Sequence, residues 1–391
     1  MPYIADIPLL SCLLAGLSLL LTIVYLWWRW SMSRAIRRRA GGRGGVDAGG
    51  LPGVSVIVYT CDQASMLQAN LPAILEQDYP CFEVIVVNDG QVAADSAVVA
   101  ELGLTHGNLY ETFVPLESRN LSRKKLALMM GVKAARHEVV VTTSASCRPD
   151  SPRWLETMAR NFTPGVEMVI GQCRYDAAAD TARFRRFRLF SWISVKTLYL
   201  GYAAKGRPFR GSAGNLAYRK SRFFEIKGFS SSMNLHHGDD DIFVSQMARK
   251  GNARVELSPQ GAVTARLLDI RRALREDKML HDFTSGYLAT SAYAVDRAMR
   301  AAYVADVAAA VAFAAVTPGW TACWAVALAL LLMVPQSLIF RRDCATLGEP
   351  GTALLVPLFT LARPVADLAL RLKGRRYRET NFTWRRKRSA T

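Results

Sequence analysis

The sequence lacks the short motifs that identify several common chemistries. Its seven cysteines form no C-x-x-C pair and no spacing typical of metal ligands, which argues against a structural zinc site and favours a reducing compartment. No G-x-G-x-x-G follows the first predicted strand, and no G-x-x-x-x-G-K-[ST] is present. The sequence therefore offers neither a dinucleotide fingerprint nor a P-loop.

Acidic residues are scarce relative to basic ones. The 391 residues include 50 Lys and Arg against 32 Asp and Glu, a net charge of +18. Residues 29–43 carry a net six positive charges and residues 371–388 a net eight, hence 14 of the 18. Because both basic segments adjoin apolar runs, the charge favours anionic membrane lipids as partners and argues against nucleic acid. The arginines and phenylalanines of residues 183–190 predict an amphipathic helix at the membrane interface.

Long uncharged runs predict membrane helices near both ends of the chain. Residues 7–28 carry no charge and are long enough to span a bilayer of about 30 Å. Residues 303–316 and 320–340 predict a transmembrane hairpin whose Asp306 must face protein or the interface. Residues 353–372 predict an interfacial or re-entrant helix. The flanking arginines place the intervening domain on the cytoplasmic side.

Between these segments the pattern alternates strand with helix. Apolar, β-branched runs at 54–58, 82–87 and 138–143 predict buried parallel strands, and residues 66–76 and 124–135 predict helices. This alternation predicts a doubly wound α/β sheet, which binds ligands beyond the carboxyl ends of its strands. A polar cluster follows each of the three predicted strands, at residues 59–62, 88–90 and 144–146.

Four segments in order make the sequence resemble a membrane-bound bacterial family 2 glycosyltransferase. They are V-S-V-I-V with F-E-V-I-V-V-N-D-G, S-R-K-K-L-A-L at 122–128, G-N-L-A-Y-R-K at 214–220 and G-D-D-D-I-F-V at 238–244. The resemblance covers residues 52–290 and implies a GT-A fold. It also implies inverting transfer of a sugar from a nucleoside-diphosphate donor to a lipid-linked or polysaccharide acceptor, at the bacterial inner membrane.

The resemblance also implies roles for individual residues. Asp240 matches the general base that deprotonates the acceptor hydroxyl. Asp62 and Asp89 match residues that contact the nucleotide base, and Lys124 matches one that approaches the diphosphate. The remaining candidates lie at the D-x-D position or in the acceptor and diphosphate region: Ser144, Ser146, Asn215, Asp239, Lys278 and His281. The alternative for residues 239–241 is a solvated turn that caps the helix beginning at Ile242.

Two positions depart from the family pattern. Ser144-Ala145-Ser146 replaces the D-x-D that binds the divalent metal, and neutral hydroxyls are poor ligands for Mg²⁺ or Mn²⁺. Residues 271–281 are basic but lack Q-x-x-R-W. Cations could replace the metal at the diphosphate, from Lys124, Arg148, Lys278 or His281. Alternatively, Asp89 or Asp150 retains a metal weakly, or the chain binds a sugar nucleotide or glycan without turnover.

The paired histidines His236 and His237 beside Asp239 invite a metal-site interpretation. Adjacent side chains generally point apart, and no third ligand lies at helical spacing, so we expect them to line the acceptor cleft instead. The predicted organisation is a membrane helix at 1–30, a basic Gly-rich linker at 31–53, a GT-A domain at 54–290, a transmembrane hairpin at 303–340, an interfacial helix at 353–372 and a basic cytoplasmic tail at 373–391.

Overall fold

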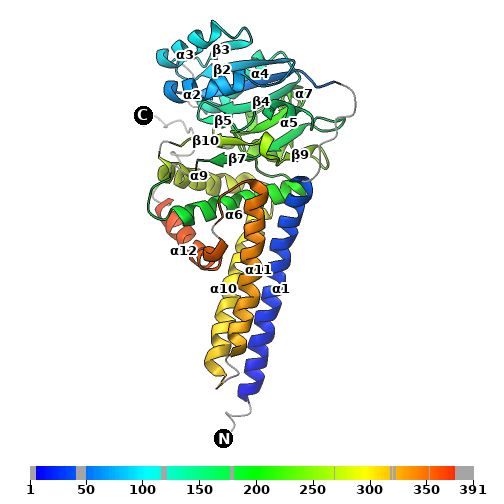
Figure 1. The fold of residues 1–391 in the computed structure, drawn as a ribbon, viewed down its shortest axis with the longest axis vertical. Coiled ribbons are helices and arrows are strands. Elements are labelled where there is room, and N and C mark those ends of the chain that lie inside the picture. The colour runs from blue at the N-terminus through cyan, green and yellow to red at the C-terminus, as the bar shows by residue number, and fades with distance from the viewer. Residues whose placement is uncertain are drawn as a thin grey trace, which may run out of the picture. The chain divides into compact units, whose positions relative to one another are not determined.

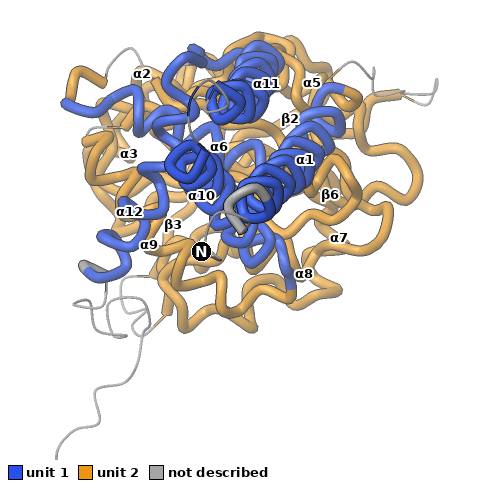
Figure 2. The backbone as a smooth tube through the Cα atoms, turned by 90° about the horizontal axis from the view of Figure 1, so that it is seen from below, with its two compact units in different colours: residues 1–37, 183–201, 290–372 blue, residues 38–182, 202–289, 373–391 orange. Residues whose placement is uncertain are grey.

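A computed structural model describes residues 6–40, 50–115, 121–176, 180–267, 269–317, 319, 323–351 and 353–374. The chain divides into two compact units (Figure 2). Unit 1 contains residues 1–37, 183–201 and 290–372, and unit 2 contains residues 38–182, 202–289 and 373–391. Most of the predicted linker and nearly all of the predicted basic tail lie outside the described residues.

Unit 2 is built on a seven-stranded sheet of order β3-β2-β1-β4-β8-β6-β9 (Figure 1). Strands β1, β2, β3 and β4 are mutually parallel, as the alternating pattern predicts, whereas β8 pairs antiparallel with both β4 and β6. The seven strands are β1 Val54–Thr60, β2 Phe82–Asn88, β3 Leu109–Phe113, β4 Val139–Ser144, β6 Met168–Gly171, β8 Leu216–Arg219 and β9 Ala253–Glu256.

The first four strands are connected by helices, which is why they can run parallel. These are α2 Ala64–Leu75, α3 Ala93–Gly103 and α4 Arg123–Ala134. Helix α4 packs on β1 and β2 at Gly131, where an added Cβ would lie 2.6 Å from Cγ2 of Ile57. Only glycine permits this close approach of helix to sheet.

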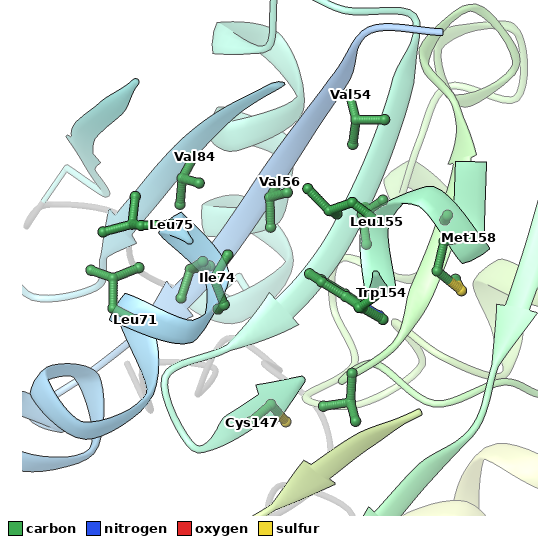
Figure 3. Packing of buried hydrophobic residues seen from close by; sticks show 14 of the residues in the cluster. Val54, Val56, Leu71, Ile74, Leu75, Val84, Cys147, Trp154, Leu155 and Met158 are labelled. Atoms are coloured by element: carbon green, nitrogen blue, oxygen red, sulfur yellow. The ribbon is translucent and has the colours of Figure 1, made fainter. Parts of the chain in front are cut away.

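The hydrophobic core of unit 2 lies on the face of the sheet that is covered by α2 and by α5 Trp154–Ala159. Figure 3 shows Val54, Val56 and Val84 from the strands, with Ile74 from α2 and Trp154 from α5, in this core. Each is fully buried, as expected for the short β-branched strands of a sheet with both faces covered. The GT-A α/β prediction is therefore confirmed.

Short elements complete unit 2. A three-stranded sheet of order β5-β10-β7 pairs β10 antiparallel with β5 and parallel with β7. The remaining elements are β5 Cys147–Pro149, β7 Cys173–Tyr175, β10 Val263–Ala265, α7 Lys220–Glu225, α8 Ile242–Met247, α9 Ile270–Thr284 and the 3₁₀ turns η1 Ser230–Ser232, η2 Pro259–Gly261 and η3 Ser285–Tyr287. Sequence periodicity did not predict these short strands.

Unit 1 is helical. Within the described residues, four helical segments are long and apolar enough to cross a membrane: Leu9–Ala40, Ala292–Val316, Cys323–Leu347 and Ala353–Leu372. They belong to α1 Asp6–Ala40, α10 Ala292–Val316, α11 Cys323–Leu347, and η5 Ala353–Leu355 with α12 Val356–Gly374; α6 Arg185–Ala204 contributes residues 185–201. Their lengths suit a hydrocarbon core of about 30 Å, and they support a membrane protein.

Two boundaries differ from the sequence prediction. Helix α1 continues through the first arginines to Ala40, where a linker was predicted from residue 31. Helix α10 begins at Ala292, eleven residues before the predicted hairpin, and is long enough to span. The charged residues obscured both helices in the hydropathy pattern, although Arg and Lys are good helix formers. Pro318, between the two predicted hairpin helices, and Trp320, predicted as the first residue of the second, lie outside the described residues.

Polar side chains inside unit 1 contact one another instead of lipid. Asp306 on α10 is 2% exposed and accepts hydrogen bonds from Ser18 at 2.5 Å and Thr22 at 2.6 Å, both on α1. The prediction that Asp306 faces protein is therefore confirmed. Lys196 and Glu349 form a second buried pair at 2.8 Å. Such contacts satisfy polar groups that hydrocarbon would leave unpaired.

Candidate active site

The carboxyl ends of β2, β1 and β4 lie side by side because the three parallel strands pair in register. Thr60 pairs with Asn88, and Tyr59 pairs with Ser144. The polar clusters predicted at residues 59–62, 88–90 and 144–146 therefore meet at one edge of the sheet. This is the edge at which open α/β sheets bind ligands.

Asp89 is held at this edge by a cation and a phenol. It is 3% exposed, accepts a hydrogen bond from Nε of Arg123 at 2.7 Å and another from the Tyr59 hydroxyl at 3.0 Å. Asp62 follows β1 in the left-handed backbone region, with φ 53°, and is exposed. Both predicted base-contacting residues thus lie on adjacent loops. Arg123 was missed by sequence reasoning, which singled out its neighbour Lys124.

The D-x-D position contains a small network of hydroxyls and a thiol. The Ser144 and Ser146 hydroxyls lie 3.0 Å apart, and Ser144 donates to Sγ of Cys147 at 3.3 Å. Hydrogen bonds from Cys173 and from these serines lower the pKa of the buried Cys147 thiol to about 6 despite its burial. This loop therefore presents hydroxyls and a thiol where the family pattern has carboxylates.

The consecutive carboxylates Asp239, Asp240 and Asp241 are all buried, so they are not a solvated turn. Asp239 forms an ion pair with Nζ of Lys124 at 2.6 Å. Asp241 is the N-cap of α8 and accepts from the Ile242 backbone N–H at 2.6 Å. Capping accounts for Asp241 and the ion pair with Lys124 for Asp239, so Asp240 requires another explanation.

His281 joins α9 to the carboxylates. Its Nδ1 lies 2.9 Å from Oδ2 of Asp241, and its Nε2 lies 3.5 Å from Oδ2 of Asp240 and 3.2 Å from Oδ1 of Asp277. Oδ1 of Asp240 has no hydrogen-bond partner among the described residues. The same holds for Oδ1 of Asp239, and buried carboxylate oxygens without a partner are unusual unless they serve a ligand or a reaction.

Burial and the charges around Asp240 shift the pKa values of both Asp240 and His281. Burial, together with Asp241 and Asp239, raises the pKa of Asp240 to about 7 against the opposing effects of His281 and Arg210. Burial and Arg210 disfavour the His281 cation, but Asp240, Asp277 and Asp241 outweigh them and raise its pKa to about 10. The site thus holds a carboxyl poised near neutrality beside a fixed imidazolium.

Lys125 fixes the loop that leads into the carboxylates. Its fully buried ammonium donates to the carbonyls of Ser232 at 2.6 Å, Leu235 at 3.3 Å and His237 at 2.6 Å, and to the Ser232 hydroxyl at 3.1 Å. Burial lowers the pKa of Lys125 to about 8. Lysine is rarely this buried without multiple partners. Its sequence signal was only its place beside Lys124.

Comparisons with known proteins concern the domain and its fold. The family model described as "Glycosyl transferase family 2" matches residues 55–226. The chain carries a family 2 glycosyltransferase domain. A search of curated proteins finds no match. Among solved structures, the chain is similar to a mannosyltransferase from Pyrobaculum calidifontis in complex with GDP-Man and Mn²⁺, with a TM-score of 0.58 and 19% identity over 91% of this chain and 99% of that chain.

The reaction class of the family 2 glycosyltransferase domain is glycosyl transfer. The family match includes β1, β2, α4 and β4 and ends before Asp239. The structural likeness, at 19% identity, concerns the fold. The carboxylates and His281 are therefore assigned from their own contacts.

The D-x-D position of this glycosyltransferase domain does not fit a divalent ion, because it offers hydroxyls and a thiol. The two carboxylates considered as substitutes are already engaged. Asp89 is bonded to Arg123 and Tyr59, whereas Asp150 lies 2.7 Å from both Arg174 and the Thr264 hydroxyl. Both carboxylates therefore already have partners among the described residues.

A different group has metal-binding donors. Ligand atoms of His237, Asp240 and His281 all lie within 4.8 Å of one another. Burial lowers the pKa of His237 to about 4, so its imidazole is neutral and able to ligate. The sequence analysis looked for a third ligand at helical spacing, whereas His281 comes from the distant helix α9; of the paired histidines, only His237 belongs to this group. Two imidazoles and a carboxylate suit Mn²⁺ or Zn²⁺ better than Mg²⁺.

The other predicted residues of the glycosyltransferase domain lie apart from this group or serve packing. Asn215 is fully buried, accepts from the Trp154 indole at 3.1 Å and donates to the carbonyls of Gln172 and Gly261. Its amide therefore holds strands together and is corrected from an acceptor contact to a structural residue. Lys278 is half-buried on α9, and Arg148 is exposed on β5.

Proposed function

We propose that the chain transfers a sugar from a nucleoside-diphosphate donor to a lipid-linked or polysaccharide acceptor, with inversion at the anomeric carbon. The observation that carries this proposal is the unpartnered carboxylate oxygen of Asp240, buried in a domain of the family 2 type. Membrane helices and terminal positive charge support a location at the bacterial inner membrane with the domain on the cytoplasmic side.

In the proposed reaction Asp240 is the general base. Its carboxylate takes the proton of the acceptor hydroxyl as that oxygen bonds to the anomeric carbon. The bond to the diphosphate oxygen breaks with its electron pair, and the nucleoside diphosphate leaves. A base with a pKa near 7 combines a useful ionised fraction with sufficient basicity. Asp241 and His281 act as positioning residues, because they contact Asp240 or its loop.

We assign the donor site to the edge formed by β2, β1 and β4. Asp62 and Asp89 are placed to contact the nucleotide base, and Ser144 and Ser146 to contact the diphosphate or sugar. Lys124 supplies positive charge, and its side chain remains 29% exposed while paired with Asp239. A fixed cation stabilises the leaving diphosphate without a metal at the D-x-D position. The GDP-Man in the mannosyltransferase structure supports a nucleotide-sugar donor.

A second candidate function is binding without turnover. The observation that favours it is the replacement of both D-x-D carboxylates by serines, which removes the usual metal ligands. The same fold and membrane helices would then serve a glycan-binding or assembly subunit. The two functions differ in whether nucleoside diphosphate is released.

We expect the purified full chain to bind a nucleotide sugar and release its nucleoside diphosphate. The experiment offers a panel of UDP- and GDP-sugars, including GDP-Man, with and without Mg²⁺ or Mn²⁺, to protein in detergent containing bacterial lipid extract. Thermal shift reports binding, and nucleotide chromatography reports release. Binding without release would favour the second function, whereas no shift with any nucleotide would refute the donor site.

We expect Mn²⁺ or Zn²⁺ to stabilise the full chain in the absence of nucleotide. An ion held by His237, Asp240 and His281 would supply positive charge beside the carboxylates, and would displace the proton of His281. Ligand at 100 times its Kd stabilises by about 2.7 kcal/mol, which a thermal melt resolves. The shift should disappear in His237→Ala and persist in the neighbouring control His236→Ala. Equal melting with and without either ion would exclude this metal site.

A further inference from the structure

A groove in unit 1 lies outside the glycosyltransferase domain. It has a volume of about 540 Å³ and is lined by α10 and α12. This volume is within the range of about 300–1,000 Å³ that small-molecule sites occupy. Both helices are long and apolar enough to cross a membrane. An occupant would therefore enter from the lipid or from the interface beside it.

One end of the groove is positively charged. Its lining includes Arg297, Arg300 and Arg371, against the single carboxylate of Asp367. Arg300 is fixed between two acids, Asp296 at 2.7 Å and Asp367. Arg297 is exposed and makes no ion pair with any described residue. Arg297 therefore contributes a positive charge to the lining that no described acid offsets, and this charge favours an anion.

The rest of the groove is apolar. Along α10 the lining continues from Arg300 through Ala301, Val304, Ala305 and Ala308, which recur at helical spacing on one face. From Arg297 to Ala308 this face extends about 16 Å at 1.5 Å per residue. All four apolar residues are exposed in the chain as described. Because alanine side chains are short, they leave room in the groove for a hydrocarbon chain.

A neighbouring cavity in unit 1 adds buried polar groups to the same region. It shares Arg300 with the groove and is also lined by Arg363 and Gln336. Arg363 is 7% exposed and its Nε has no hydrogen-bond partner among the described residues; the same holds for Oε1 of Gln336, which is 2% exposed. Buried polar atoms of this kind normally have a partner, and the cavity between them, at about 20 Å³, has room only for a group about the size of one water molecule.

We propose that this groove binds a phosphate-bearing membrane lipid, with the phosphate at Arg297 and Arg371 and the hydrocarbon chain along the alanine face. Charge complementarity selects an anionic headgroup over a zwitterionic one. The apolar length selects a lipid over free phosphate. Arg300, which is paired with Asp296 and Asp367, lies at the charged end of the groove and helps to position the lipid phosphate. The site is distinct from the sugar-nucleotide edge, and binding is measurable without any sugar donor.

The test measures binding of dioleoyl phosphatidic acid to the delipidated full chain in detergent. Dioleoylglycerol, which has the same chains and no phosphate, and inorganic phosphate, which has no chains, are the comparison ligands. We expect saturable binding of phosphatidic acid only. The double variant R297Q/R371Q should raise its Kd about 30-fold, since each basic residue near a lipid surface changes the Kd about fivefold.

Matched variants separate the groove from general charge. R341Q/R342Q removes two exposed arginines of α11 that do not line the groove and should change Kd less than about 3-fold. Ala305→Phe fills the groove without altering charge and should abolish binding, whereas Ala298→Phe, on the same helix outside the lining, should not. Equal affinity for dioleoylglycerol, competition by inorganic phosphate, or an unchanged Kd in R297Q/R371Q would each overturn the proposal. None of these outcomes depends on whether the chain transfers sugar.

Discussion

Asp240→Asn is expected to lower kcat about 10²- to 10⁴-fold while leaving the Kd of the sugar nucleotide within about 3-fold. The substitution keeps the shape of the side chain but removes the group that accepts the proton of the acceptor hydroxyl. Donor binding survives because Asp89, Arg123 and Lys124 lie on other elements. Nucleoside-diphosphate release under saturating donor measures kcat, and isothermal titration measures Kd.

The pH profile provides an independent check of the same residue. The carboxyl of Asp240 has its pKa raised to about 7, so it is protonated below that pH and cannot accept a proton. Activity should therefore fall about tenfold for each pH unit below 7 and level off above it. Asp240→Asn should retain no such slope.

A matched carboxylate controls for the loss of negative charge. Glu276 lies on α9, is exposed, and pairs with Arg272 at 2.8 Å. Glu276→Gln should keep kcat within about 2-fold, because exposed ion pairs contribute little. If Asp240→Asn retained more than a tenth of the original kcat, another group would have to be the base.

Lys125→Met is expected to destabilise the chain by about 3 kcal/mol. Methionine fills the space of the lysine stem, but the carbonyls of Ser232, Leu235 and His237 lose their shared buried donor. Each unsatisfied buried acceptor costs about 1–3 kcal/mol, partly offset by removing a buried charge. Thermal melting should show a decrease in Tm of about 6–12 °C for a domain of this size.

Lys133→Met is the matched control for Lys125→Met. Lys133 lies on the same helix α4 but is exposed, so its replacement should shift Tm by less than about 2 °C. Lys125→Met should also weaken turnover, because the loop it fixes leads directly to Asp239. An unchanged melt would show that the loop is held by other contacts.

The parallel half of the sheet could be predicted from the sequence because its strands are continuous β-branched runs. These runs predicted strands β1, β2 and β4, and the Asp-Gly that follows the run of β2 helped to predict the polar edge that the three strands form. The strands β5, β7 and β10 are three residues each, too short for periodicity to separate them from loops.

The chemistry of the site could be predicted less completely. Asp240 was identifiable from three adjacent carboxylates and from the resemblance, but its contacts arise across long separations. His281 reaches Asp241 from 40 residues away, and Arg123 reaches Asp89 from 34. Pairings of this kind depend on tertiary packing. Asn215 illustrates the converse, since its motif was recognisable and its role in strand packing was not.

The hydrogen bonds from Ser18 and Thr22 to Asp306 also bear on how the protein is made. The residues are 288 and 284 positions apart, so α1 is synthesised long before its partner on α10 exists. At about 5–20 residues per second, this interval lasts roughly 15–60 seconds. Throughout it the two hydroxyls must bond to their own helix backbone. Helix α1 therefore lacks these contacts in the bilayer until the glycosyltransferase domain has been translated and α10 has been made.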